Sequence, residues 1–130
     1  MYRSMRRTII TIDEQKRVHF PDTNANEIWM STIELVELLG ITYPTLRAAI
    51  KAIYKSGIVK EYDAERYITL PNGNGMDIYS LQMITALIFR IDTPEAYRLR
   101  EVIISRLCQR DTKSNSLMMY ISPHNTQYPC

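Results

Sequence analysis

The sequence lacks the features by which several large classes of protein are recognised. Its longest apolar stretch, residues 83–91, is interrupted by Thr85 and Arg90 and is far shorter than the roughly 20 residues that a membrane-spanning helix needs. The three arginines within residues 1–7 are not followed by an apolar run long enough for a signal peptide. We therefore expect a cytoplasmic protein that does not enter a membrane.

Residues that perform catalysis or bind metals are also sparse. Cys108 and Cys130 do not have the spacing of a metal or redox motif, and His19 and His124 lie far apart without ligand-like neighbours. The sequence contains no glycine-rich loop followed by Lys-Ser or Lys-Thr, the signature of a nucleotide-binding P-loop. The sequence thus predicts a protein that is not an enzyme and that uses neither a cofactor nor a metal.

The overall composition of the chain is typical of one globular domain. A chain of 130 residues with 45% hydrophobic and 23% charged residues has the size and balance of such a domain. The net charge is only +2, from 16 Lys and Arg against 14 Asp and Glu, so the total charge identifies no partner. We expect one domain over residues 1–110 and a loose polar tail over residues 111–130, whose apolar run at 117–121 is a candidate for docking on a partner.

Turn-forming and β-branched residues predict a mixed α and β fold. A hairpin is expected at residues 67–79, where two β-rich runs flank Asn-Gly pairs. A small N-terminal β-sheet is expected from strands at residues 8–12, 16–20 and 27–30, and residues 58–62 are expected to be extended.

Capping residues mark where the predicted helices begin and end. Ser31 and Glu34 form a capping box, and the helix that they start ends at Gly40. Thr42 begins a second helix, which runs to residue 56. Two C-terminal helices are expected at residues 81–91, capped by Ser80, and from residue 94 to about residue 110.

Residues 31–56 satisfy the helix-turn-helix pattern, in which two helices cross steeply around a tight turn. Gly40 lies in the turn, and apolar residues occupy the positions that the two helices must bury between them. The second helix would be offered to the major groove of DNA, and the hairpin at residues 67–79 would be a wing. We therefore expect an α+β, winged helix-turn-helix-like domain.

Basic residues cluster on the second helix of this pattern. Arg47, Lys51 and Lys55 are spaced four residues apart, so they lie along one side of a helix. With Lys60 they give residues 38–60 four positive charges and no negative one, a favourable surface for DNA phosphates. Arg47 could bond a guanine bidentately, whereas the lysines are better placed for phosphates.

The candidate DNA-binding residues comprise this basic stripe, polar residues beside it, and the start of the first helix, whose amides could contact a phosphate. They are Tyr43, Thr45, Arg47, Lys51, Lys55, Lys60, Ser31 and Thr32. A homodimer on double-stranded DNA is expected, because a single small module reads few base pairs. The sequence leaves open a module that binds a protein partner instead, since a basic helix face is often only solvated.

Three short motifs resemble the RhuM-type virulence protein family. They are Glu27-Ile28-Trp29-Met30-Ser31, Gly40-Ile41-Thr42, and the closing Phe89-Arg90-Ile91-Asp92 with Ala96 and Leu99-Arg100. The closing motif is also similar, more loosely, to the N-terminal domains of phage antirepressors. The resemblance spans residues 27–107 and implies a bacterial mobile-element or prophage protein that binds DNA to regulate transcription, or a protein-interaction module of antirepressor type.

The chain departs from that family in two places. Family members have polar residues where this chain has Tyr43-Pro44-Thr45-Leu46 at the start of the second helix. They also continue into a longer C-terminal region, so the resemblance implies a truncated or stand-alone module.

Overall fold

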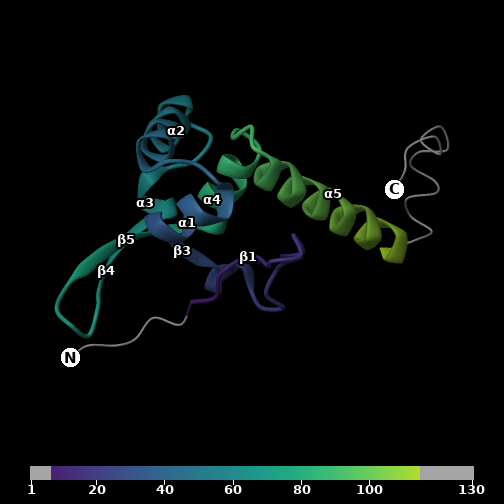
Figure 1. Ribbon diagram of the computed structural model, residues 1–130, viewed down its shortest axis with the longest axis horizontal. Helices are drawn as coiled ribbons and strands as arrows, with labels where there is room; N and C mark the ends of the chain where they lie inside the picture. Colours follow the sequence, from purple (N-terminus) through teal and green to yellow (C-terminus); the bar gives the residue numbers. More distant parts are fainter. Residues whose placement is uncertain (1–6, 115–130) are drawn as a thin grey trace.

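The computed structural model describes residues 7–114, which form a mixed α and β fold (Figure 1). In chain order its elements are β1 (Thr11–Ile12), β2 (Val18–His19), the 3-10 helix η1 (Ala25–Glu27), β3 (Trp29–Ser31), α1 (Thr32–Leu39), α2 (Tyr43–Ser56), α3 (Glu61–Ala64), β4 (Glu65–Thr69), β5 (Gly75–Ser80), α4 (Leu81–Ile88) and α5 (Pro94–Ser114). The expected α+β class is confirmed.

The strands form two small antiparallel sheets. β1 and β2 make a short hairpin. The larger sheet has the order β3-β5-β4, with Trp29 opposite Ser80 and Arg66 opposite Ile78. The central strand, β5, therefore pairs with a neighbour in sequence on one side and with a strand from before α1 on the other.

The sequence predicted both hairpins correctly but was wrong about the partner of β3. The hairpin at residues 67–79 is present as β4 and β5, joined by a turn in which the Leu70 amide donates to the Asn74 carbonyl. The N-terminal sheet contains two strands rather than three, because β3 pairs with β5. The first strand is also shorter than expected, since Thr8 makes only an isolated bridge with Ile28.

The prediction of an extended segment at residues 58–62 is also wrong. Gly57 adopts the left-handed conformation, with φ of 83°, and turns the chain at the end of α2. Val59 is then buried in the core, and α3 begins at Glu61. One turn of helix therefore replaces the expected strand and leads directly into β4.

The predicted caps of α1 and α2 are confirmed. The Glu34 amide donates to Ser31 Oγ (3.3 Å), and the Ser31 amide donates to Glu34 Oε1 (2.8 Å), which completes the capping box. Gly40 ends α1 with φ of 65°, a left-handed conformation that glycine adopts without strain. Thr42 caps α2 by accepting a hydrogen bond from the Thr45 amide.

The two C-terminal helices differ in length from the prediction. α4 ends at Ile88 rather than at residue 91, and the Arg100 guanidinium donates to the carbonyls of Ile88 and Ile91 (2.8 and 2.9 Å). α5 continues to Ser114, past the expected end at Arg110. The rest of the expected tail, including the apolar run at residues 117–121, lies outside the described residues.

The core lies where α1, α2, α4 and the first turns of α5 meet the larger sheet. Its largest fully buried side chains include Leu35, Leu39, Leu46, Ile53, Ile78, Met83, Ile84, Leu87 and Leu99. In Figure 1, α2 and the β4–β5 hairpin lie toward one end of the molecule, and α5 extends from the other. No helix within residues 7–114 combines the length and the apolar character needed to cross a membrane.

Candidate nucleic-acid interface

The basic stripe of α2, defined as Arg47, Lys51 and Lys55, is exposed along its whole length. The rotation of α2 is set by its apolar residues: Leu46, Ala49, Ile50 and Ile53 are buried at helical spacing. The stripe occupies the opposite side of the helix, as the sequence predicts. Among the side chains that the structure describes, those of residues 7–109, no carboxylate forms an ion pair with any of its three cations.

At the start of α2, Tyr43 holds the Arg47 side chain. Arg47 Nη1 donates to the Tyr43 hydroxyl at 3.1 Å, and its guanidinium carbon lies 5.6 Å from the centre of the Tyr43 ring. The hydrogen bond with Tyr43 raises the pKa of Arg47 above its already high value. One tyrosine one helical turn earlier thus restricts the guanidinium while both side chains remain on the surface.

The remaining candidate DNA-binding residues differ in their exposure and in their position relative to the basic stripe. Thr45 is exposed on α2, where its hydroxyl accepts a hydrogen bond from Thr42 Oγ1 (2.9 Å). Lys60 is exposed but lies beyond the turn at the end of α2, as the N-cap of α3. Ser31 is buried and its amide is bonded to Glu34, while Thr32 is half-buried. The start of α1 therefore already holds a carboxylate.

Arg90 is a surface cation that the sequence reasoning missed. It is exposed and lines a shallow depression of about 350 Å³ together with Thr45 and Ala48 of α2. Asp92 lines the same depression and partly offsets its charge. The juxtaposition arises because α4 packs against α2, and no local pattern in the sequence indicates it.

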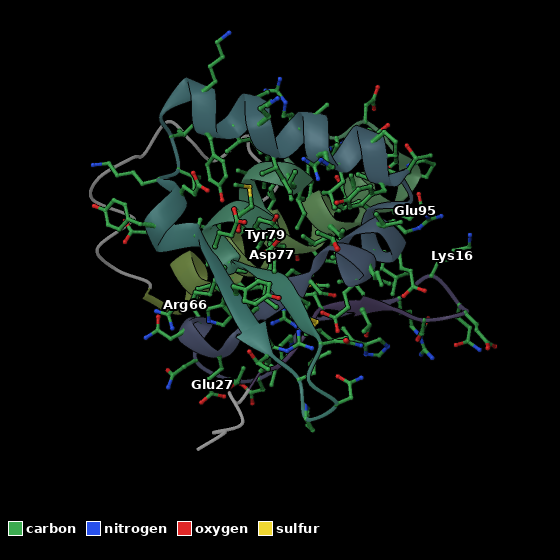
Figure 2. All side chains as sticks on the ribbon, turned by 90° about the vertical axis from the view of Figure 1, so that its left-hand side faces the viewer. Lys16, Glu27, Arg66, Asp77, Tyr79 and Glu95 are labelled. Carbon is green, nitrogen blue, oxygen red and sulfur yellow. The ribbon has the colours of Figure 1, made fainter. Side chains whose placement is uncertain are left out.

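The sheet face toward α2 is acidic. The Tyr54 hydroxyl of α2 donates to Glu65 Oε1 on β4 at 2.8 Å, and burial raises the pKa of Glu65 above its ordinary value. Asp77 and Tyr79 follow one another on that face of β5 (Figure 2). Burial, together with Glu65 and Asp77, raises the pKa of Tyr79 to about 12. A DNA phosphate would be repelled there.

The tip of the hairpin offers no cation. Residues 71–74 contain neither Arg nor Lys, and Arg66 is the basic residue of the two strands. Because side chains alternate along a strand, Arg66 lies on the opposite face of the sheet from Glu65. Its guanidinium carbon lies 4.8 Å from the centre of a Trp29 ring.

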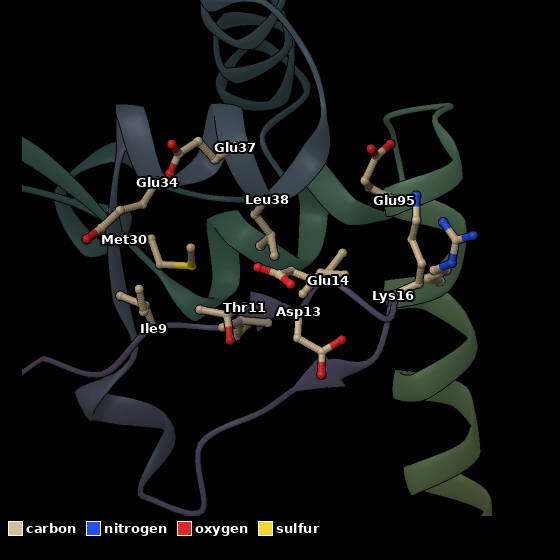
Figure 3. Close-up of a pocket in the computed structure, with 13 residues that line it drawn as sticks. Ile9, Thr11, Asp13, Glu14, Lys16, Met30, Glu34, Glu37, Leu38 and Glu95 are labelled. Carbon is tan, nitrogen blue, oxygen red and sulfur yellow. The ribbon is translucent and has the colours of Figure 1, made fainter.

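A second concavity, of about 500 Å³, lies between the β1–β2 hairpin, α1 and the start of α5 (Figure 3). Its lining combines apolar residues and the cations Lys16 and Arg98 with acidic side chains, including Asp13, Glu34, Glu37 and Glu95. Two of these are already bound: Asp13 pairs with Arg17 and His19, and Glu34 with Arg7. Within the described residues, no group of His, Cys, Asp or Glu could hold a metal ion.

Comparisons with known proteins add no relative: no protein-family model, no curated protein and no solved structure matches this chain. Its function is therefore inferred from the surfaces and charges of the described residues.

Proposed function

We propose that this protein is a winged helix-turn-helix module that binds duplex DNA without catalysing a reaction and regulates transcription. In this proposal α2 enters the major groove, with Arg47 toward the base edges and Lys51 and Lys55 toward phosphates. The single observation that supports it most is the basic stripe, which is exposed and forms no ion pair with any side chain of residues 7–109. Arg90 adds a fourth cation beside α2.

The order of elements supports the winged helix-turn-helix assignment. The helix pair α1–α2 lies between β3 and the β4–β5 hairpin, and the three strands form one sheet in the order β3-β5-β4. In this order a hairpin follows the second helix in the chain, as in a winged helix-turn-helix. The hairpin tip has no Arg or Lys, so we assign base and phosphate contacts to α2 rather than to the wing.

The acidic sheet face defines which side of α2 is used. Glu65 and Asp77 repel phosphates on the side of the hairpin, so the duplex approaches the stripe from the opposite side. A single α2 reads only a few base pairs, and we propose that the protein binds as a homodimer on two half-sites. Multi-angle light scattering of the full chain tests the dimer directly.

We further propose, from the resemblance of its short motifs to RhuM-type proteins, that this activity belongs to a bacterial mobile element or prophage. The same resemblance also supports a second candidate, a protein-interaction module of antirepressor type. The observation in its favour is the outer surface of α5, where Tyr97, Ile104 and Leu107 are about half exposed (56%, 48% and 57%). Large apolar side chains on a helix that extends from the domain are typical of a protein-docking surface.

Fluorescence anisotropy with a labelled random-sequence duplex, titrated at low and moderate salt, tests DNA binding. We expect saturable binding that weakens as the salt concentration rises, because released counterions contribute to affinity. Absence of binding at low salt would overturn the proposal and favour the protein-interaction module. The same experiment with single-stranded DNA of equal length separates groove binding from attraction to any polyanion.

A further inference from the structure

The strongest unexplained feature outside α2 is an open groove on the face of the sheet away from α2. It has a volume of about 1380 Å³ and extends along one side of α4, from Ser80 to Phe89. The segment that follows α2, from Ile58 to Lys60, forms the opposite wall. Its apolar side chains are unusually open to solvent: Ile58 is 74% exposed and Phe89 is 50% exposed.

One end of this groove gathers hydrogen-bond donors. Ser80 lies opposite Trp29 and Arg66 lies opposite Ile78, so the side chains of Ser80, Arg66 and Trp29 share one face of the sheet. All three line the groove, as does Lys60. Neither Lys60 nor Arg66 forms an ion pair with a described side chain, those of residues 7–109. Asp63 is the one carboxylate of the lining, so the groove has a net positive charge.

Ser80 has a buried hydroxyl without a partner. The residue is only 9% exposed, and among the described residues nothing forms a hydrogen bond with its Oγ. As the N-cap of α4, Ser80 would ordinarily accept a bond from a first-turn amide, but it makes no such bond. The first-turn amides of α4 therefore have no side-chain cap, and the hydroxyl is shielded from bulk water. A buried polar group in this state is costly unless a ligand supplies the partner.

We propose that this end of the groove, formed by Ser80, the first turn of α4, Arg66 and Lys60, binds the anionic head of a small amphipathic molecule. A helix N-terminus and two cations favour a carboxylate or a phosphate monoester, and the Ser80 hydroxyl donates to one of its oxygens. The apolar body of the ligand lies along Leu81 and Ala86 of α4 and Phe89, which follows its last residue. The site is on the opposite face of the sheet from the acidic residues beneath α2, so it is separate from the DNA interface.

Trp29 provides a direct readout, because it is the only tryptophan in the sequence and lines the groove beneath Arg66. The full chain is titrated with phenyl phosphate and with phenylacetate, which share an aromatic body and differ in the anionic head. We expect each to change the Trp29 emission saturably, with the tighter of the two identifying the preferred head. Calorimetry under the same conditions measures binding independently of Trp29.

Two probes test which parts of the ligand matter. 2-Phenylethanol, which has no charge, is expected to bind at least about tenfold more weakly than the anions, because it forms no charge-assisted hydrogen bonds. Inorganic phosphate is expected to bind more weakly than phenyl phosphate because it has no apolar body. Equal affinity of the neutral alcohol and the anions would overturn the anionic site, and equal affinity of the two phosphates would overturn the apolar subsite.

Variants of Ser80 and Arg66, each with a matched control variant, test whether these two side chains bind the anion. S80A and R66Q are each expected to weaken anion binding about five- to tenfold or more, since each removes one donor to a charged group. S80A should fold at least as stably as the parent, because it removes an unpaired buried hydroxyl. The controls are S105A and R98Q, which change a serine and an arginine of α5 outside the groove and should leave the affinity unchanged.

The inference is overturned if neither anion changes Trp29 emission or produces a calorimetric signal, or if S80A and R66Q bind both anions as tightly as the parent. A result of that kind would show that the buried Ser80 hydroxyl needs no ligand and that the groove is only a surface irregularity. The titrations contain no DNA, so their outcome does not depend on whether α2 binds a duplex.

Discussion

The carboxylate of Glu95 lies directly against Gly40, in the turn between α1 and α2. A Cβ atom at Gly40 would be 2.6 Å from Glu95 Oε1, closer than nonbonded atoms approach. A second contact reinforces this one, because Thr93 Oγ1 donates to the Leu39 carbonyl at 2.7 Å. The first turn of α5 therefore fixes the turn that sets the angle between the two helices.

Substitution of Gly40 tests this relationship. G40A places a side chain at φ of 65° and against Glu95, and the backbone strain alone should lower the free energy of unfolding by about 1–2 kcal/mol. Urea denaturation measures the change. G57A is the matched control, since Gly57 is also left-handed, with φ of 83°, but a Cβ atom there would have nothing within 4 Å.

Comparing G40A with G57A separates the cost of backbone strain from the cost of the contact with Glu95. Because the clashing atoms are the end of the flexible Glu95 side chain, which can turn away, we expect G40A to be only slightly more destabilising than G57A and the double variant G40A/E95A to recover that small difference. Equal losses in G40A and G57A would show that Glu95 moves aside without cost and that α5 does not constrain the turn.

Neutralising the basic stripe should weaken DNA binding without unfolding the domain. If about four phosphates are neutralised per protomer, log affinity falls with log salt at a slope of about −3 to −4. R47Q/K51Q should lower the affinity and reduce the magnitude of the slope by about 2. Both side chains are exposed, so the thermal midpoint should change little.

A charge-matched double variant provides the control for that experiment. R98Q/R106Q removes two positive charges from α5 and should reduce the affinity much less than R47Q/K51Q does. Equal effects of the two double variants would mean that total charge, rather than the stripe on α2, attracts the duplex.

Glu65 should make stability depend on pH in an unusual direction. Burial raises the pKa of this carboxyl above 4.5, so folding favours its protonated form. The stabilisation is complete below pH 4.5 and is lost as the pH rises through the folded-state pKa. E65Q stays neutral and its amide oxygen still accepts from Tyr54, so at pH 7 it should be more stable than the parent by less than about 1 kcal/mol.

Thermal denaturation at several pH values measures this difference. The advantage of E65Q should disappear as the pH falls below 4.5, where Glu65 is protonated in both states. A parent protein that is more stable than E65Q at pH 7 would show that the charged carboxylate is favoured beside Tyr54.

Asp13, in the β1–β2 hairpin, should make stability depend on pH in the opposite direction from Glu65. The bond from His19 Nε2 (2.9 Å), together with the Arg17 amide and guanidinium, lowers the pKa of Asp13 from 3.8 to about 2. The contribution of the ionised Asp13 carboxylate to stability is present above pH 3.8 and is lost as the pH falls toward 2. Carboxyl carbon chemical shifts measure this titration directly, and D13N should loosen the hairpin at neutral pH. A midpoint near 3.8 would contradict the pairing.

Local signals in the sequence were sufficient for the helix boundaries around the turn. The capping box of Ser31 and Glu34 and the left-handed Gly40 involve residues within one or two turns, so their chemistry can be read directly from the order of residues. The exposure of Arg47 follows in the same way from the buried positions of α2.

Features that depend on distant partners could not be predicted in that way. The strand at Trp29 was expected to join the N-terminal hairpin, whereas its partner Ser80 comes from a strand far along the chain. Arg90 reaches the side of α2 only through the packing of α4, and the groove beside Arg66 depends on the register of three strands. Hydrophobic periodicity and helix-capping residues in the sequence indicate none of these long-range contacts.

The central position of β5 has a consequence for how the protein is made. During synthesis, β3 leaves the ribosome about 50 residues before Ser80, the residue that pairs with Trp29. Until then the nascent chain contains α1, α2 and the β1–β2 hairpin but lacks the larger sheet against which their buried side chains pack. Closing this long loop is entropically costly, so the larger sheet forms only after β5 has emerged, and the core is completed only when α4 and the start of α5 follow it.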